Sequence, residues 1–166
     1  ERAAETGINY FDTARSYQNG QNERMVGAAL KNWRKKVIIT SKSPGQTKEA
    51  ALRDLDTSLR EIGTDYLDIW YMHAKDRADQ ILPEILEAQQ LAKKQGKVRF
   101  PGLSTHNGHA EVIPAAFGAG LAHVFEVRHF GEALRVPGQA VKEGLVEFRV
   151  DQPGARTGDL VRHAAG

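Results

Sequence analysis

The segment TKEAALRDLDTSLREIGTDYLDIWYMH, residues 47–73, decides the fold because it joins an amphipathic helix to an apolar strand. Its apolar residues recur at the spacing of one helix face: Leu52, Leu55, Leu59 and Ile62. Thr47 is placed to cap the start of this helix, and Gly63 is placed to end it. The run from Tyr66 to Met72 then predicts a buried strand.

The same alternation continues on both sides of this segment. Strands are predicted at Ile8 to Asp12, Lys36 to Ser41, Tyr66 to Met72, Val98 to Leu103 and His123 to Val127. Helices are predicted at Asn22 to Trp33, Thr47 to Ile62, Gln80 to Lys94, with Asp79 as its cap, and His109 to Phe117. Strands that alternate with amphipathic helices form parallel βαβ units, so the fold class is α/β. Such a sheet either closes into a (β/α)8 barrel or stays open and doubly wound.

Composition excludes several classes of protein. The 166 residues suffice for one domain, and 40% hydrophobic with 27% charged residues is a globular composition. The apolar runs are far shorter than the ~20 residues of a membrane span. The net charge of +2 is spread along the chain, which disfavours nucleic acid as a partner. The absence of cysteine excludes disulfides and zinc–thiolate sites, and we expect a cytoplasmic protein.

Polar residues recur where the predicted strands end. Asp12, Lys42, His73 and Ser104 follow one another at intervals of about 30 residues, the length of one βα unit. In a barrel these strand ends meet at one rim, where enzymes of this fold have their active sites. Singly, each residue has a simpler explanation, such as a turn cap, a snorkelling lysine or a buried imidazole. Charged groups at successive strand ends are costly to desolvate unless they pair, so we expect one shared cluster.

Tyr17 follows Asp12 by five residues, on the loop that leaves the first predicted strand. A phenol is a weak acid near neutral pH, but an adjacent ammonium stabilises the phenolate. Lys42 could supply that ammonium, Asp12 could hold Lys42, and His73 could hydrogen-bond a substrate oxygen. Such a set suits protonation of a carbonyl oxygen while hydride reaches the carbon.

These residues resemble the aldo-keto reductase family over about Glu5 to Val127. The resemblance is carried by segments that recur in the family's order: Gly7 to Ala14 followed by Tyr17, Ile39 to Lys42, Leu55 to Leu59, Gly63 to Asp68, His73, and Gly96 to Arg99. It implies a (β/α)8 barrel that reduces aldehydes or ketones, small-molecule substrates, with a nicotinamide cofactor. We expect NADP(H) ahead of NAD(H).

The resemblance also implies a role for each matching residue. Tyr17 matches the family's proton donor, Lys42 the lysine that makes it more acidic, Asp12 the carboxylate paired with that lysine, and His73 the histidine that orients the carbonyl. Three further residues match the family's contacts to the nicotinamide amide: Ser104, Thr105 and Glu126. Thr105 stands where Asn is more usual and Glu126 where Gln is more usual, so the expected cofactor pocket departs from the family pattern at two positions.

The strand–helix rhythm fades after residue 128. We expect residues 1–128 to form a partial barrel of about five parallel strands and residues 129–166 to form a divergent or irregular tail, as in a truncated or frame-changed chain. We expect the unclosed sheet edges to favour self-association. Because a catalytic site needs its supporting shell, the family resemblance does not by itself predict activity for the 166-residue chain.

Other functions compete with reduction. One is a non-catalytic nucleotide-binding or regulatory subunit on the same barrel. Another is an isomerase or lyase that uses Lys42 as a Schiff-base amine. No metal is expected, since His106 and His109 lie in no carboxylate constellation. The Gly118-Ala119-Gly120 turn closes a helix, the reverse of a dinucleotide-binding turn.

Overall fold

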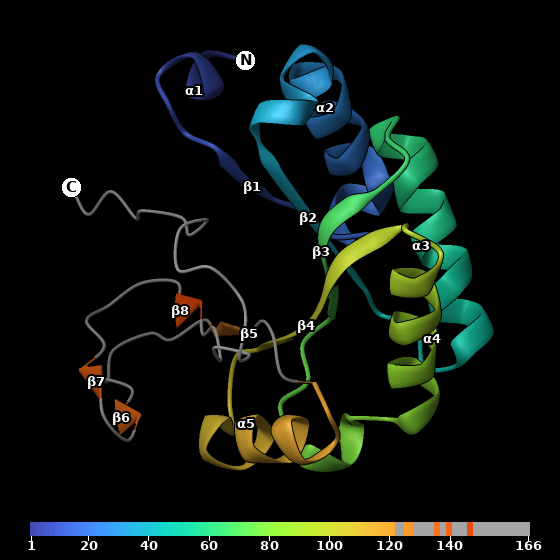
Figure 1. The fold of residues 1–166 in the computed structure, drawn as a ribbon, viewed down its shortest axis with the longest axis vertical. Coiled ribbons are helices and arrows are strands. Elements are labelled where there is room, and N and C mark those ends of the chain that lie inside the picture. The colour runs from blue at the N-terminus through green and yellow to red at the C-terminus, as the bar shows by residue number, and fades with distance from the viewer. Residues whose placement is uncertain (122–124, 128–134, 137–138, 141–145, 148–166) are drawn as a thin grey trace.

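Parallel strands dominate the computed structural model, which describes residues 1–121, 125–127, 135–136, 139–140 and 146–147 (Figure 1). The main sheet has the strand order β1-β2-β3-β4-β5-β8. Its parallel strands are β1 (Tyr10–Asp12), β2 (Ile38–Ser43), β3 (Leu67–Met72), β4 (Val98–Thr105) and β5 (Phe125–Val127). β8 (Val146–Glu147) is antiparallel to β5, and β6 (Arg135–Val136) pairs with β7 (Gln139–Ala140) in a separate two-stranded sheet.

Helices alternate with the parallel strands. They are α1 (Arg2–Glu5), α2 (Gln21–Leu30), α3 (Lys48–Ile62), α4 (Pro83–Lys94) and α5 (His109–Gly118), with short 3-10 turns η1 (Tyr17–Gly20), η2 (Lys31–Lys36) and η3 (Ala78–Gln80). α2, α3 and α4 lie side by side along one face of the sheet (Figure 1). This is the arrangement of successive βαβ units, and it confirms the α/β class and the partial (β/α)8 barrel.

Helix α3 forms as its sequence pattern predicts. The Thr47 hydroxyl accepts a hydrogen bond from Ala50 N at 3.2 Å, which satisfies one of the free donors of the first turn. Gly63 ends the helix with φ +73°, a left-handed conformation that glycine adopts without steric cost. The buried face carries Ala51, Leu55, Ser58, Leu59 and Ile62.

The predicted start of α4 is wrong. The helix begins at Pro83, and Asp79 lies in η3, where its carboxylate pairs with Arg77 at 2.9 Å. A residue before proline is disfavoured in the helical region, and Leu82 is extended, with φ −77° and ψ 131°. The helix therefore cannot continue backward from Pro83 to Asp79.

Several other boundaries also differ from the prediction. β1 starts at Tyr10, and Ile8 is 53% exposed. β2 and β4 run two residues beyond their predicted ends, so Lys42 and Ser104 lie one residue inside their strands. These shifts leave the alternation of side chains between the two faces unchanged.

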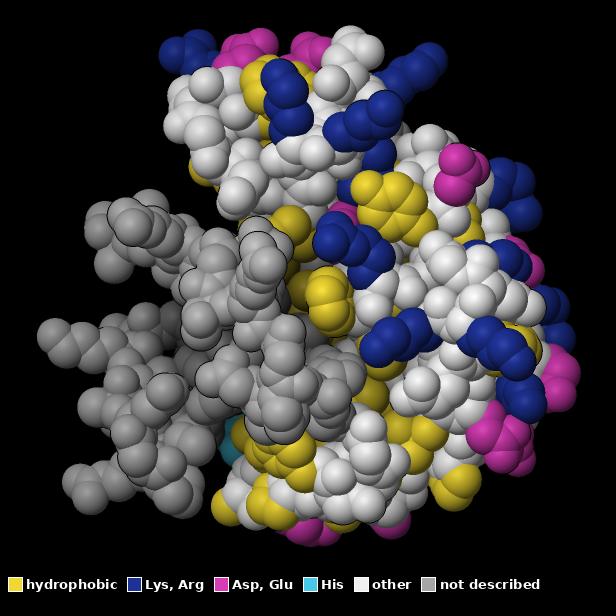
Figure 2. Space-filling view, viewed as in Figure 1, with side chains coloured by type: hydrophobic (Ala, Val, Ile, Leu, Met, Phe, Trp, Pro, Cys, Tyr) yellow, Lys and Arg dark blue, Asp and Glu magenta, His cyan; other side chains and the backbone are white. Residues whose placement is uncertain are grey.

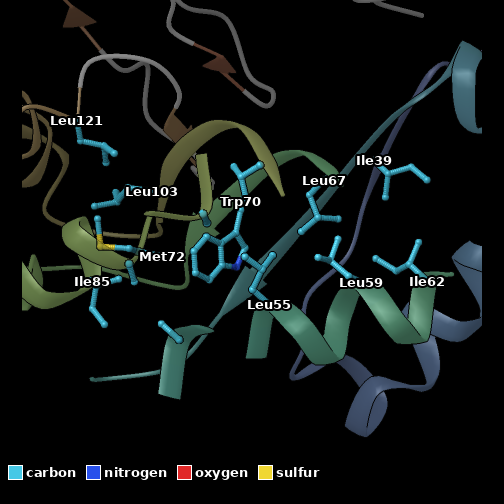
Figure 3. Close-up of a cluster of buried hydrophobic side chains, with 14 of the residues drawn as sticks. Ile39, Leu55, Leu59, Ile62, Leu67, Trp70, Met72, Ile85, Leu103 and Leu121 are labelled. Atoms are coloured by element: carbon cyan, nitrogen blue, oxygen red, sulfur yellow. The ribbon is translucent and has the colours of Figure 1, made fainter. Parts of the chain in front are cut away.

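Apolar side chains fill both faces of the sheet, but unequally. The larger cluster lies between the sheet and the helices, and it includes Ile39, Leu55, Leu59, Ile62, Leu67, Trp70, Met72, Ile85, Leu103 and Leu121 (Figure 3). A smaller cluster joins Ile69 and Tyr71 to Tyr10 and Ile38. Side chains alternate along a strand, so this second cluster occupies the opposite face, beneath Lys42 and His73.

The surface carries both signs of charge. On the face drawn in Figure 2, basic side chains are interspersed with acidic ones. Among the helices that the structure describes, none combines the length and apolar character of a membrane span. Within the same residues no cluster of three or more His, Asp or Glu side chains could hold a metal ion.

Candidate active site

A buried lysine forms the centre of the candidate site. Lys42 in β2 is 1% exposed, and its Nζ donates to Asp12 Oδ1 at 2.6 Å and Oδ2 at 2.5 Å. It also donates to the carbonyl oxygen of Thr13 at 3.2 Å. The Thr40 hydroxyl donates to Asp12 Oδ1 at 2.7 Å, which fixes the carboxylate from a second side. An ammonium at this depth is stable because a carboxylate and the Thr13 carbonyl oxygen surround it.

Tyr17 reaches the same ammonium from the loop after β1. Its hydroxyl oxygen lies 3.5 Å from Lys42 Nζ, and the same Nζ lies 5.1 Å from the centre of the Tyr17 ring. Tyr17 is the first residue of η1, and its backbone N–H donates to Ala14 O at 3.0 Å. The turn thus carries the phenol back over the end of β2.

His73 follows β3 directly and faces Tyr17. The two rings meet edge to face, with centres 5.8 Å apart and planes at 78°. The Ser16 hydroxyl lies 3.3 Å from His73 Nδ1. Burial, followed by the Lys42 ammonium, lowers the pKa of His73 from 6.5 to about 4. The imidazole is therefore neutral at pH 7, with one ring nitrogen as donor and the other as acceptor.

An apolar floor lies under these groups. Ile38 and Ile69 pack with Tyr10 and Tyr71, and the two tyrosine hydroxyls are 3.0 Å apart. Lys42 Nζ lies 5.9 Å from the centre of the Tyr71 ring. Because such surroundings have a low dielectric constant, the charges above them interact more strongly than they would in water.

The two residues expected at the nicotinamide amide from β4 are engaged with neighbouring loops. The Ser104 hydroxyl accepts from Ala74 N at 2.9 Å and lies 3.3 Å from the Met72 carbonyl oxygen, to which it donates. The Thr105 hydroxyl donates to Asn107 O, 2.6 Å away. A hydroxyl has two lone pairs, so each retains some capacity as an acceptor.

Glu126 lies in β5, opposite Ser104 in the parallel register. Its side chain lies outside the described part of the structure, as does most of the predicted tail at residues 129–166. The structure thus brings Asp12, Tyr17, Lys42 and His73 together and places Ser104 on the neighbouring strand.

Sequence reasoning missed two contacts of the site. Thr40 could have been found, because it lies two residues before Lys42 and so faces the same side of the sheet. Ser16 gave no signal, since its contact with His73 depends on the path of the loop between β1 and η1.

Comparison with known proteins identifies the family. The model of the Aldo/keto reductase family matches residues 1–124. The chain belongs to this family. It is 32% identical over 117 residues to an uncharacterized oxidoreductase, YqkF, of Bacillus subtilis, covering 63% of this chain and 38% of YqkF. It is 36% identical over 104 residues to the methylglyoxal reductase YeaE of Escherichia coli, covering 60% of this chain and 35% of YeaE.

Solved aldo-keto reductases share the fold. The Klebsiella pneumoniae enzyme in complex with NADPH has a TM-score of 0.65 and 30% identity, covering 75% of this chain and 44% of that one. The holo form of aldo-keto reductase AKR11C1 from Bacillus halodurans has a TM-score of 0.60 and 26% identity, covering 76% and 54%. These aldo-keto reductases confirm the family inferred from the sequence. The chain spans between 30% and 40% of the length of the curated relatives it matches.

Proposed function

We propose that this aldo-keto reductase chain carries the proton-delivery residues of an NAD(P)H-dependent reductase of aldehydes or ketones, with Tyr17 as the proton donor. The observation that carries the proposal is the position of the Tyr17 hydroxyl, 3.5 Å from an ammonium that both Asp12 oxygens hold. The names of the relatives, which include a methylglyoxal reductase and an L-galactose dehydrogenase, support carbonyl chemistry.

Lys42 acts on the step in which the proton leaves Tyr17. When the phenol gives its proton to a carbonyl oxygen, a negative charge develops on the phenol oxygen. The nearby ammonium stabilises that charge, and the apolar floor strengthens the interaction. Asp12 keeps Lys42 charged and in place, so the carboxylate acts through the lysine.

His73 positions the carbonyl oxygen as a neutral donor. If the Ser16 hydroxyl donates to Nδ1, the ring proton resides on Nε2, which can then donate to a substrate oxygen. A pKa of about 4 keeps this ring neutral across the physiological range. The edge-to-face contact with Tyr17 supports this role, since we expect two adjacent donors to reach the same substrate oxygen.

The proposed cofactor site consists of residues from β4 and β5. A bound nicotinamide cofactor supplies the hydride, and NADP(H) is favoured because solved Klebsiella pneumoniae aldo-keto reductases are complexes with NADP or NADPH. Ser104 fits a carboxamide, since its oxygen keeps an acceptor lone pair at the end of β4. We place Thr105 and Glu126 beside it, as the next residue of β4 and the register partner on β5.

The organisation of the chain limits where turnover is expected. We propose residues 1–128 as the barrel unit and residues 129–166 as a separate tail. Because an active site needs a complete supporting shell, we expect the 166-residue chain alone to be inactive or slow. Its open edges, with β1 paired on one side among the described strands, favour self-association.

The Schiff-base alternative does not fit Lys42. A nucleophilic amine must be neutral, whereas this Nζ donates to both oxygens of Asp12. Borohydride treatment with a carbonyl compound should therefore leave Lys42 unmodified.

The test is NADPH oxidation with methylglyoxal, run on the 166-residue chain and on a chimera. In the chimera, the part of this chain that aligns with YeaE replaces the matching segment of YeaE, so that the rest of a barrel is supplied. We expect Tyr17→Phe to lower kcat of the chimera by about 100-fold or more, because a positioned general acid contributes that much. Tyr66→Phe is the control, since Tyr66 precedes β3 at the other end of the strand. Unchanged turnover in Tyr17→Phe would overturn the assignment, and NADPH binding without reduction would favour the non-catalytic subunit.

A further inference from the structure

A second buried ion pair lies beside the segment that carries Tyr17. Glu23 in α2 is completely buried, and its Oε2 forms an ion pair with Arg15 Nη1. Its other oxygen accepts a hydrogen bond from the Ser41 hydroxyl at 2.6 Å. A charged pair at this depth is costly to desolvate, so its position calls for an explanation beyond packing.

Each partner contacts the chain at or next to Lys42. Arg15 N donates to the carbonyl oxygen of Lys42 at 3.0 Å, and Tyr17 follows Arg15 by two residues. Ser41, which binds Glu23, directly precedes Lys42. The pair therefore connects the start of α2 to the two chain segments that must hold a phenol against an ammonium.

A neighbouring contact strengthens the same connection. Asn22, next to Glu23 in α2, accepts a hydrogen bond from the Thr13 hydroxyl at 2.7 Å. The Thr13 carbonyl oxygen in turn accepts from Lys42 Nζ at 3.2 Å. The first turn of α2 thus holds the loop after β1 at two positions, Thr13 and Arg15.

The loop between Tyr17 and α2 has a backbone that needs such support. Gln18 and Asn19 have φ of +49° and +52°, and Gly20 has φ +83°. Left-handed conformations of non-glycine residues persist only where their surroundings hold them. The Arg15 guanidinium lies in the space where a side chain at position 20 would begin, so it packs directly against Gly20.

From these contacts we infer that Arg15 and Glu23 are positioning residues, which fix the Tyr17 hydroxyl at Lys42 without touching the substrate. The inference rests on the proposed function of Tyr17. Loss of the Glu23 charge leaves a guanidinium without its partner, so the loop relaxes and the phenol moves from the ammonium. A misplacement of about 1 Å at a reacting group can cost on the order of 100-fold in rate.

The test variant is Glu23→Gln, which keeps the size of the side chain and an oxygen for Ser41 but removes the charge. In the chimera with YeaE we expect kcat to fall by about 10- to 100-fold, with KM for methylglyoxal and Kd for NADPH within about twofold of the parent. Glu87→Gln is the matched control. It breaks an ion pair with Lys48, 2.9 Å apart on the protein surface and away from Arg15, and should change none of the three constants.

A second readout is independent of turnover and uses the 166-residue chain. The rings of Tyr17 and His73 are close enough for a nuclear Overhauser effect, and so are those of Tyr10 and Tyr71. In Glu23→Gln we expect the first effect to be lost and the second to remain, which shows a fold that persists with a displaced Tyr17. Loss of the first effect alone would support positioning even if Tyr17→Phe disproved the proton-donor role.

Two results would overturn the inference. One is a Glu23→Gln variant that keeps both its kcat and the contact between Tyr17 and His73. The other is recovery of kcat in the double variant Arg15→Met/Glu23→Leu. An apolar pair restores stability but not the contact with Gly20, so recovery would show that the ion pair contributes stability and does not position Tyr17. If Glu23→Gln does not fold, Arg15→Lys is used in its place. That variant keeps the charge but not the shape of the guanidinium, and it should lower kcat in the same way.

Discussion

The ion pair between Asp12 and Lys42 predicts a large loss of stability when its charge balance is broken. Asp12→Asn keeps the shape of the side chain but removes the counter-charge of an ammonium that is 1% exposed. Removing one partner of a buried ion pair costs about 3–5 kcal/mol. The Asp12 side chain is 22% exposed, so water screens part of the interaction, and we expect a loss of about 3 kcal/mol, at the lower end of that range.

The opposite variant should cost less. Lys42→Met leaves a carboxylate that still accepts a hydrogen bond from Thr40 and that contacts water, so we expect a loss of about 1–2 kcal/mol. The double variant Asp12→Asn/Lys42→Met has no buried charge left to compensate, and its stability should return to within about 1 kcal/mol of the wild type. The two single changes are therefore expected to be strongly non-additive.

Urea unfolding of all four proteins at pH 7, followed by far-ultraviolet circular dichroism, gives these free energies. A loss below about 1 kcal/mol in Asp12→Asn would refute the reasoning, because it would mean that the ammonium is hydrated. Additive effects of the two single variants would refute it equally, since they would show that the two charges do not interact.

Three further expectations follow from other residues. His73 should titrate by NMR with a pKa of about 4. Because the unfolded chain takes up this proton near pH 6.5, the free energy of unfolding should fall as the pH drops from 6.5 through 4. His73→Gln should remove this part of the pH dependence. Lys75 is 3% exposed, and burial lowers its pKa, so stability should rise as the pH approaches 10.5, the ordinary pKa of lysine. Lys75→Met should be more stable than the wild type below that pH. A less stable Lys75→Met variant would argue against burial as the cause of the lowered pKa. Thr47→Ala should cost about 1 kcal/mol in urea unfolding through the lost bond from Ala50, and Thr47→Ser should restore most of it.

Local periodicity was sufficient to predict the five parallel strands and the meeting of their polar ends at one rim. Side chains alternate along every strand, so Asp12, Lys42 and His73 project from the sheet on the side of Tyr10, Thr40 and Tyr71 whichever residue begins the strand. Errors of two residues at the strand ends therefore did not disturb the site. The start of α4 was misplaced because a single proline outweighed a favourable cap upstream.

The approach of Tyr17 to Lys42 could not be derived from periodicity. It depends on a loop with left-handed conformations at Gln18 and Asn19, residue types that do not require them. Glu23 would be expected on a solvated helix face. It is buried together with a cationic partner, Arg15, which comes from the loop after β1. Both features arise from tertiary contacts; the sequence indicated Tyr17 by its place on the loop after the first strand, and the family resemblance supplied its expected role.

The residues proposed to deliver the proton lie on three adjacent strands or on the segments that follow them, in one interval from Asp12 to His73. In (β/α)8 barrels the phosphate-binding loops often follow the last strands. A crossover between genes at a point after β3 would thus transmit the acid–base apparatus whole while exchanging the part that selects the nucleotide. The segment proposed to deliver the proton and the segments that select the nucleotide could then be inherited, and engineered, separately.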